Sequence, residues 1–258
     1  IIAVGSFNGV ADFDPGTGVL NESTGGSEDA FVWRLSSAGD LVWVKFLKSD
    51  ESVRLNSVKL GDQDTLYLAG WYSDSVDFDP NAGEDILVSY TSNGGINYTN
   101  NVFVAKWTSN GEHIWARGMI GNDEGESYRV DIDNNQNVYV AGEFQGTTDF
   151  DPSSGVFNLT ASNGSDFFVF KLSRFGDFVW AKHITENMFG ITDVEVDGND
   201  NVYFLGSFFG TVDLDPGFDI RNANTSAGSY FLIKLEPCVP SATTDTVVIC
   251  NGAPFTWI

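Results

Sequence analysis

The sequence predicts an all-β protein, a β-propeller of four-stranded antiparallel blades with about four blades represented. Three observations lead to this prediction. Four landmarks recur in the same order along the chain, each landmark has the composition of a short strand, and no stretch carries a sustained helical stripe. A single four-stranded meander cannot bury both of its faces, whereas copies stacked around an axis can. A β-solenoid is the nearest alternative, but its repeats are shorter, on the order of 20–30 residues.

The first landmark is an Asp-x-Asp-Pro motif in which the second residue is Phe or Leu. Four of the seven prolines in the chain belong to it, so a high proline content does not explain why the motif recurs. Its four copies are Asp12-Phe13-Asp14-Pro15, Asp77-Phe78-Asp79-Pro80, Asp149-Phe150-Asp151-Pro152 and Asp213-Leu214-Asp215-Pro216.

Three further landmarks accompany this motif. A five-residue segment with Phe first and a base fourth begins at Phe31, Phe103, Phe168 and Phe231. A Gly precedes a Trp by four residues at Trp43, Trp115 and Trp180, and a base follows two residues later. An aliphatic segment followed by an Asn-Val-Tyr-Val-like segment ending in Gly occupies 58–70, 130–142 and 194–206.

These segments are five to seven residues long, rich in Val, Phe, Tyr and Trp, and bounded by Gly or Asn, as short strands are. The predicted order in each unit is strand a, turn, strand b, a longer polar loop with the Asp-x-Asp-Pro motif, strand c, turn and strand d. We expect propeller repeats over 1–237, with approximate blades at 1–50, 51–120, 121–185 and 186–237. Residues 238–258 are expected to be a tail or the start of a following module.

The first copy begins at strand b and the last ends at strand c, which gives fourteen predicted strands. One interpretation is that upstream blades precede this chain and that a strand before Ile1 completes the last blade. The other is a four-bladed ring that closes imperfectly. The chain also starts without Met or a leader, which favours a processed product or an internal fragment.

The landmarks together resemble the bacterial SBBP-type β-propeller repeat of secreted and surface proteins. The closest matches are the segment from Gly146 to Pro152 and Trp180-Ala181-Lys182, and the resemblance covers about residues 1–236. It departs mildly in the first copy at Trp33, Arg34 and Val44, and in the fourth at Leu214. The resemblance implies one propeller blade per repeat and an extracellular location, and it implies no catalytic residues.

The charge balance excludes several classes of partner. The chain has a formal net charge of −23, from 36 acidic and 13 basic residues, so its surface repels nucleic acid and anionic lipid. No run of about 18 apolar residues exists, so no membrane insertion is expected. The remaining partners are a protein or glycan at the cell exterior, or other domains of the same polypeptide.

The paired carboxylates are the candidate metal ligands. Residues i and i+2 of a strand share a face, so each pair could hold Ca²⁺ together with loop carbonyls. The alternatives are that the carboxylates cap a turn, or that they pair with the repeated bases between blades. The candidate calcium residues are Asp12, Asp14, Asp77, Asp79, Asp149, Asp151, Asp213 and Asp215.

Catalysis is not expected, because catalytic sites usually break repeat symmetry and these carboxylates occur in every copy. The two histidines, His113 and His183, have no evident partner in the sequence and are read as packed or surface residues. The repeated Trp residues are expected to pack between blades. Aromatic residues outside the repeat pattern are better ligand candidates, and we assign to the second b–c loop the candidates Trp71, Tyr72, Tyr90 and Tyr98.

Covalent features are limited to the C-terminal part and to short glycosylation patterns. Cys238 and Cys250 are the two cysteines, and an oxidising compartment would allow a disulfide between them. Asn-x-Ser/Thr triplets lie at Asn21, Asn97, Asn158, Asn163 and Asn224, and Asp-Ser/Thr-apolar triplets begin at Asp64, Asp74 and Asp245. These triplets make a glycoprotein a hypothesis.

The sequence therefore predicts a non-catalytic, secreted or cell-surface scaffold for adhesion or for protein or glycan interaction, within a larger protein. The alternatives are a carbohydrate-binding lectin and a propeller glycosidase or lyase acting on polysaccharide. An enzyme of that kind would show a cluster of unique acidic and aromatic residues at the central face of the ring.

Overall fold

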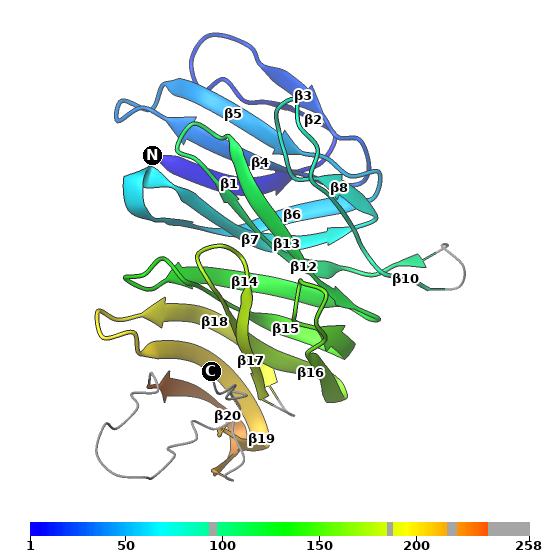
Figure 1. Cartoon of the computed structure of the whole chain (residues 1–258), viewed down its shortest axis with the longest axis vertical. Coiled ribbons are helices and arrows are strands. Elements are labelled where there is room, and N and C mark those ends of the chain that lie inside the picture. The colour runs from blue at the N-terminus through cyan, green and yellow to red at the C-terminus, as the bar shows by residue number, and fades with distance from the viewer. Residues whose placement is uncertain (93–96, 185–187, 216–220, 237–258) are drawn as a thin grey trace.

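The structure is a computed structural model that describes residues 1–92, 97–184, 188–215 and 221–236. It is an all-β propeller fold in which four antiparallel units, here called blades 1 to 4, follow one another from the blue to the orange end of the chain, with blades 2 and 3 joined in one 8-stranded sheet (Figure 1). The predicted fold class is thus confirmed. The single helical element in the described part is a 3-10 turn, η1 (Asp62–Asp64), so no described helix is long enough to cross a membrane.

Each blade orders its strands as the sequence predicts. Blade 1 contains β1 (Ile2–Phe7), β4 (Asp29–Leu35) and β5 (Leu41–Leu47), which are its strands b, c and d. Blade 2 contains all four, namely β6 (Ser52–Leu60), β7 (Leu66–Ser73), β12 (Asn101–Trp107) and β13 (His113–Gly121).

Blade 3 is also complete, with β14 (Gly125–Ile132), β15 (Val138–Asp149), β16 (Asn158–Leu172) and β17 (Phe178–Ile184). Blade 4 has strands a, b and c, which are β18 (Met188–Val196), β19 (Val202–Asp213) and β20 (Asn222–Leu235). Over the described residues the four blades hold the fourteen strands that the landmarks predict.

The b–c connections form small hairpins beside the blades. They are β2 (Val10–Asp12) with β3 (Asn21–Ser23), β8 (Ser75–Asp77) with β9 (Ile86–Val88), and β10 (Thr91–Ser92) with β11 (Asn97–Tyr98). In blades 3 and 4 the same hairpin is continuous with strands b and c, which explains why β15, β16, β19 and β20 are long.

Glycine sets the c–d turns. Gly39, Gly111 and Gly176 have φ of 90°, 74° and 83°, a left-handed conformation that glycine adopts without steric cost. In each turn the side-chain oxygen of the Ser or Thr three residues before the glycine accepts a hydrogen bond from a backbone N–H. This bond replaces a hydrogen bond that the strand pairing does not supply at the turn.

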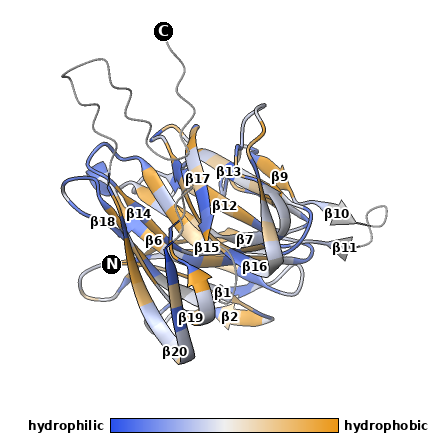
Figure 2. Ribbon diagram, turned by 90° about the horizontal axis from the view of Figure 1, so that it is seen from below, coloured by the Kyte–Doolittle hydropathy of each residue, from blue (hydrophilic) through white to orange (hydrophobic). Residues whose placement is uncertain are grey.

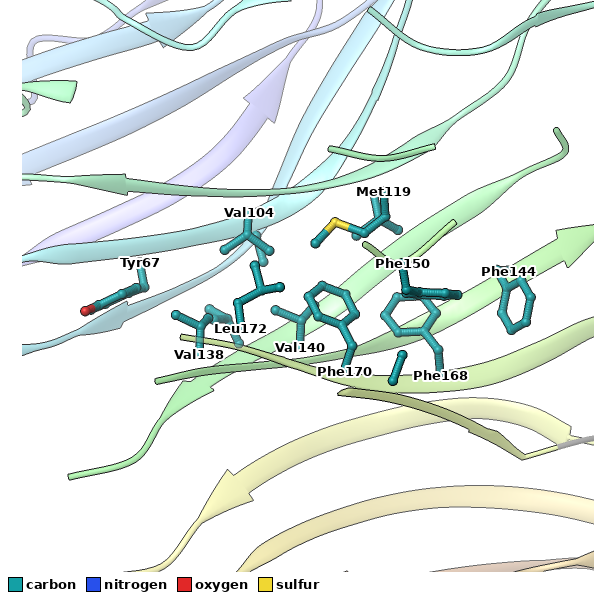
Figure 3. Packing of buried hydrophobic residues seen from close by; sticks show 14 of the residues in the cluster. Tyr67, Val104, Met119, Val138, Val140, Phe144, Phe150, Phe168, Phe170 and Leu172 are labelled. Atoms are coloured by element: carbon teal, nitrogen blue, oxygen red, sulfur yellow. The ribbon is translucent and has the colours of Figure 1, made fainter. Parts of the chain in front are cut away.

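The core lies between successive blades, because each blade has two apolar faces. One cluster of buried side chains joins blades 1 and 2, a second joins blades 2 and 3, and a third joins blades 3 and 4. Figure 3 shows the second cluster, where Val104 and Met119 from above meet Val140, Phe168 and Phe170 from below. No apolar cluster of the described residues joins blade 1 to blade 4.

Main-chain hydrogen bonds also connect blades. Blade 1 is bound to blade 2 by the Val53 N–H, which donates to the Glu28 carbonyl (2.9 Å). Blades 2 and 3 are joined more extensively, since Ile120 and Gly121 of β13 pair with Asp149 and Thr148 of β15. The described contacts between blades 3 and 4 include instead a side-chain bond, in which the Val196 N–H donates to Asp131 Oδ2 (2.7 Å).

Candidate functional site

The first Asp of each Asp-x-Asp-Pro motif closes its loop. Oδ1 of Asp149 accepts the N–H groups of Asp151 (3.0 Å) and Phe157 (2.8 Å), which lie two and eight residues later. The same two bonds recur in the other copies, made by Asp12, Asp77 and Asp213. Hydrogen bonds from Leu20 and Asp14 lower the pKa of Asp12, which keeps the accepting carboxylate ionised.

The residue after this Asp anchors the loop to the blade. Phe13, Phe78 and Phe150 are buried, and Phe150 packs against Phe144 with ring centroids 5.4 Å apart. The second Asp lies beyond the strand, where its Oδ1 accepts the N–H two residues later, as Asp151 does from Ser153 (2.9 Å). The strand thus ends at the first Asp, so the expectation that both carboxylates share one strand face is wrong.

The candidate calcium ligands are already engaged within their own loops. Oδ1 of the first Asp already faces two N–H groups, whose positive ends oppose a cation. In the described part of the chain, no group of three or more His, Cys, Asp or Glu side chains comes together to hold a metal ion. The turn geometry accounts for the motif, and calcium binding stays a prediction.

The repeated bases have other partners than these carboxylates. Lys106, Lys171 and Lys234 lie over the rings of Tyr67, Tyr139 and Tyr203 in the neighbouring strand b. Lys171 also contacts Asp133 (Nζ to Oδ2, 3.1 Å). The expected carboxylate–base ladder between blades appears in part among the described residues. Asp215 of blade 4 lies near Lys182 of blade 3, and its charge raises the pKa of this lysine, whereas burial lowers it.

The repeated Trp residues line the interfaces, as predicted. Trp115 is 7% exposed and belongs to the cluster between blades 2 and 3. The turn glycine of the following blade packs against the Trp or the base that follows it. A Cβ at Gly111 would lie 3.3 Å from Trp43 and 3.2 Å from Lys45. The landmark therefore locks successive blades together.

Two of the four residues predicted for the ligand-binding loop do not lie in it. Trp71 and Tyr72 lie in β7 and are 7% and 0% exposed, because strand b continues past Gly70. Tyr90, which is 42% exposed, and Tyr98 do lie in the loop. The Asn side chains of the triplets at Asn21, Asn158 and Asn224 are exposed, and Cys238 and Cys250 fall outside the described residues.

Both histidines have acidic partners that the sequence did not indicate. His113 Nε2 lies 2.8 Å from Asp85 Oδ2, and His183 Nδ1 lies 3.1 Å from Asp166 Oδ2. A comparison of the repeats contains the signal for the first pair. Phe157 and Phe178 occupy the equivalent positions of blade 3 and pack with their ring centroids 4.9 Å apart, so an apolar pair in one blade is replaced by an acid–histidine pair in the other.

A pair of carboxylates outside the repeat pattern lies on strands a and b of blade 3. Glu126 of β14 is directly opposite Glu143 of β15. Burial, and then the charge of Glu143, raises the pKa of Glu126. Burial and a hydrogen bond to Glu143 raise the pKa of Tyr128. In blade 2 the corresponding pair is Arg54 and Trp71, with the guanidinium carbon 5.3 Å from the ring centroid.

Comparison with known proteins supports the repeat architecture. No protein-family model matches the chain. The chain is 32% identical over 111 residues to an uncharacterized WD repeat-containing protein of Acanthamoeba polyphaga mimivirus. WD repeats form propeller blades. The match covers 37% of this chain and 8% of the viral protein, so it spans a small part of that relative's length.

Proposed function

We propose that the chain is a non-catalytic interaction scaffold, a rigid propeller whose residues outside the repeat pattern recognise a protein. One observation carries this proposal. The acids, bases and Trp residues that recur between blades are engaged in loop closure and blade packing, which leaves recognition to the residues that differ between blades. The WD repeat similarity supports the same function class, because radial repeats present extended binding surfaces.

We further propose that the scaffold belongs to a bacterial secreted or surface-anchored protein of the SBBP-repeat type and acts in adhesion. The resemblance of the Asp-Phe-Asp-Pro and Trp-Ala-Lys segments supports this assignment, and so does the net charge of −23, which suits solubility in a salty exterior. Immunodetection on intact cells of the producing organism tests the location. Signal that appears only after the cells are lysed contradicts it.

Binding to those cells tests the scaffold function. The folded chain should bind the cell surface saturably, and protease treatment of the cells should abolish this binding. A glycan array, together with labelled polysaccharides incubated with the same protein, supplies the contrary outcomes. Glycan binding without cleavage would indicate a lectin, and release of new reducing ends would indicate an enzyme.

One observation favours the enzyme as the second candidate. Glu126 and Glu143 face each other across two strands beside Tyr128, and a carboxyl of raised pKa next to a second carboxylate is the arrangement that glycosidases use. In that function the carboxyl of raised pKa, Glu126, would protonate the leaving oxygen. Glu126→Gln should then reduce cleavage at least a hundredfold with unchanged substrate binding. Polysaccharides left intact by the wild-type chain exclude this candidate.

A further inference from the structure

A pocket of about 430 Å³ lies on the outer side of the boundary between blades 2 and 3. Strand β13 forms its base, β9 forms one wall, and the loop that follows β15 forms the other, with Pro152 and Ser153 in its lining. Tyr72 lies beneath it with a fully buried side chain. Its phenol oxygen has no hydrogen-bond partner among the described residues. Burial alone raises the pKa of Tyr72, so this hydroxyl stays protonated and able to donate.

The hydroxyl of Tyr72 is specific to blade 2. The residue at the equivalent position of strand b, which also faces the start of strand c, is a phenylalanine in each of the other blades: Phe7, Phe144 and Phe208. A phenyl ring therefore satisfies the packing there. Burying a hydroxyl without a partner costs about 1–3 kcal/mol, which blade packing does not require.

Gly118 is a second departure at the same place. It faces Phe103 of strand c, and the residues that face the equivalent phenylalanine in blades 1 and 3 are Phe46 and His183. Those side chains fill the equivalent space with rings. Phe46 packs on Phe13 at 4.8 Å between centroids, and His183 packs on Phe144 at 6.0 Å.

Blade 2 has no ring of its own at this point. A Cβ at Gly118 would lie 2.8 Å from the Tyr72 hydroxyl and 3.5 Å from both Leu87 and Ile120. The Tyr72 hydroxyl occupies the space nearest to Gly118, where a side chain at that position would begin. The rest of that space belongs to the pocket, which is open to a ring from another molecule.

The wall of the pocket departs from the repeat as well. Ile86 and Val88 of β9 are 52% and 57% exposed. Their equivalents in the other blades are polar, with Asn21, Asn158 and Asn222 at the first position, and Ser23, Thr160 and Asn224 at the second. Ile120, which follows Met119, is 38% exposed. The residue at its equivalent position in blade 1 is the charged Lys48, which follows Leu47. Figure 2 shows β9 as an orange segment beside β13.

The equivalent groove lies between blades 1 and 2. It shows that the substitutions in blade 2 change the chemistry of the pocket and not its volume. It also has a volume of about 430 Å³, yet Phe46 occupies its strand position, and the two lysines that line it, Lys45 and Lys48, are matched there by Asp77 and Asp79. In the pocket of blade 2 two carboxylates, Asp85 and Asp177, stand with a single base. This base is Arg117, and its guanidinium donates to the carbonyls of the chain around Gly176.

We propose that this pocket binds a tyrosine side chain of a protein partner, flanked in the partner by basic residues; this deepens the scaffold function proposed above and rests on it. The ring takes the space that Phe46 and His183 fill in the other blades. Ile86, Val88 and Ile120 contact its faces, and its phenol oxygen accepts from Tyr72. The flanking bases face Asp85 and Asp177, in a chain that carries a net charge of −23.

A tyrosine fits these walls better than a sugar. The exposed aliphatic surface comes from β9 and Ile120, and the one aromatic ring among the lining residues is fully buried, so no aromatic face is available for a pyranose to stack on. Tyrosine combines a large apolar area with one polar tip, which matches a pocket with an aliphatic wall and a buried hydroxyl at its base.

The probe is the tripeptide acetyl-Lys-Tyr-Lys-amide, with acetyl-Lys-Ala-Lys-amide and a methyl glucoside as matched comparisons. The readout is methyl NMR of the intact chain, with the Ile86, Val88 and Ile120 signals assigned. The tyrosine peptide should shift these signals saturably. The variant Tyr72→Phe/Gly118→Phe, which recreates the residues of blade 1, should weaken its binding at least tenfold.

A surface variant guards against misfolding. Ile86→Asn with Val88→Ser restores the polar residues of the other hairpins without touching the core, and it should also weaken binding at least tenfold. Ile114→Asn replaces an isoleucine that is 46% exposed on β13 but does not line the pocket, so binding should be unchanged.

Several results would overturn the assignment. They are no shift by the tyrosine peptide at 10 mM, equal affinity for the alanine peptide, tighter binding of the glucoside, or unchanged affinity in the two pocket variants. A chain that still binds the cell surface in a protease-sensitive manner, while failing with the tyrosine peptide, would refute the pocket and leave the scaffold function in place.

Discussion

Removing the carboxylate of Asp149 tests the account of the Asp-x-Asp-Pro motif. Asp149→Ala deletes the Oδ1 atom that accepts the N–H groups of Asp151 and Phe157, and it leaves both donors to find water or remain unpaired. Asp149→Asn has the same shape and keeps an acceptor oxygen, so it separates the hydrogen bonds from the charge.

The magnitude follows from the two bonds. Each hydrogen bond contributes roughly 0.5–1.5 kcal/mol net, and more when the acceptor is charged. Both bonds of Asp149 are partly buried, so we expect Asp149→Ala to lower the free energy of unfolding by about 2–3 kcal/mol. For a chain of this size that corresponds to a fall in Tm of about 4–12 °C. Asp149→Asn should cost about 1 kcal/mol or less.

Thermal unfolding followed by circular dichroism, with and without calcium, is the assay. Loop closure predicts that calcium and a chelator leave the wild-type Tm unchanged and that the loss in Asp149→Ala is the same in both. A calcium-dependent rise in Tm that disappears in Asp149→Asn would refute this reasoning and support the metal. An Asp149→Ala chain as stable as the wild type would refute both.

The other predictions concern packing, turn geometry and pH. Phe150→Ala should lower the free energy of unfolding by about 3–5 kcal/mol, because the ring is fully buried among three others; urea unfolding measures it, and a cost below 1 kcal/mol would contradict the packing. Gly111→Ala should cost about 2–4 kcal/mol from positive φ and contact with blade 1, whereas Gly39→Ala, with no atom near its Cβ, should cost only the strain of about 1–2 kcal/mol; equal losses would argue against blade packing at this turn. A hydrogen bond from the Asn201 side chain is the main cause that lowers the pKa of Asp197 to about 2, so its stabilisation is complete above the unfolded value near 3.8 and is lost as the pH falls toward 2. Asp197→Asn should flatten the fall in stability over that window, and an unchanged slope would show that other carboxylates cause it.

The strand order was predictable because each strand repeats its own pattern. Copies of the Phe-first segment and of the Gly-to-Trp spacing mark strands c and d in every complete blade, and a repeated element must have a place in every copy. The strand ends were not predictable in the same way. Strand b runs on through Trp71 and Tyr72, beyond the Gly70 that marks its end in the pattern, because it keeps pairing with β12.

The candidate sites were harder to predict, because they depend on what differs between repeats. Comparing the copies column by column would have shown that Asp85 and His113 replace an apolar pair, and that Tyr72 and Gly118 replace aromatic residues. That Glu126 and Glu143 lie opposite each other could be seen only in the structure. An irregularity between Ser127 and Arg129 shifts the register of β14, so simple alternation along the strand does not give its partners.

The way in which the blades are tied together has a mechanical consequence. Blades 1 and 2 are linked from main chain to main chain at Val53, and blades 2 and 3 more extensively, where β13 pairs with β15. A stretching force applied along the chain will therefore have to break the paired strands β13 and β15 before blades 2 and 3 separate. These two blades should leave the fold as one cooperative block.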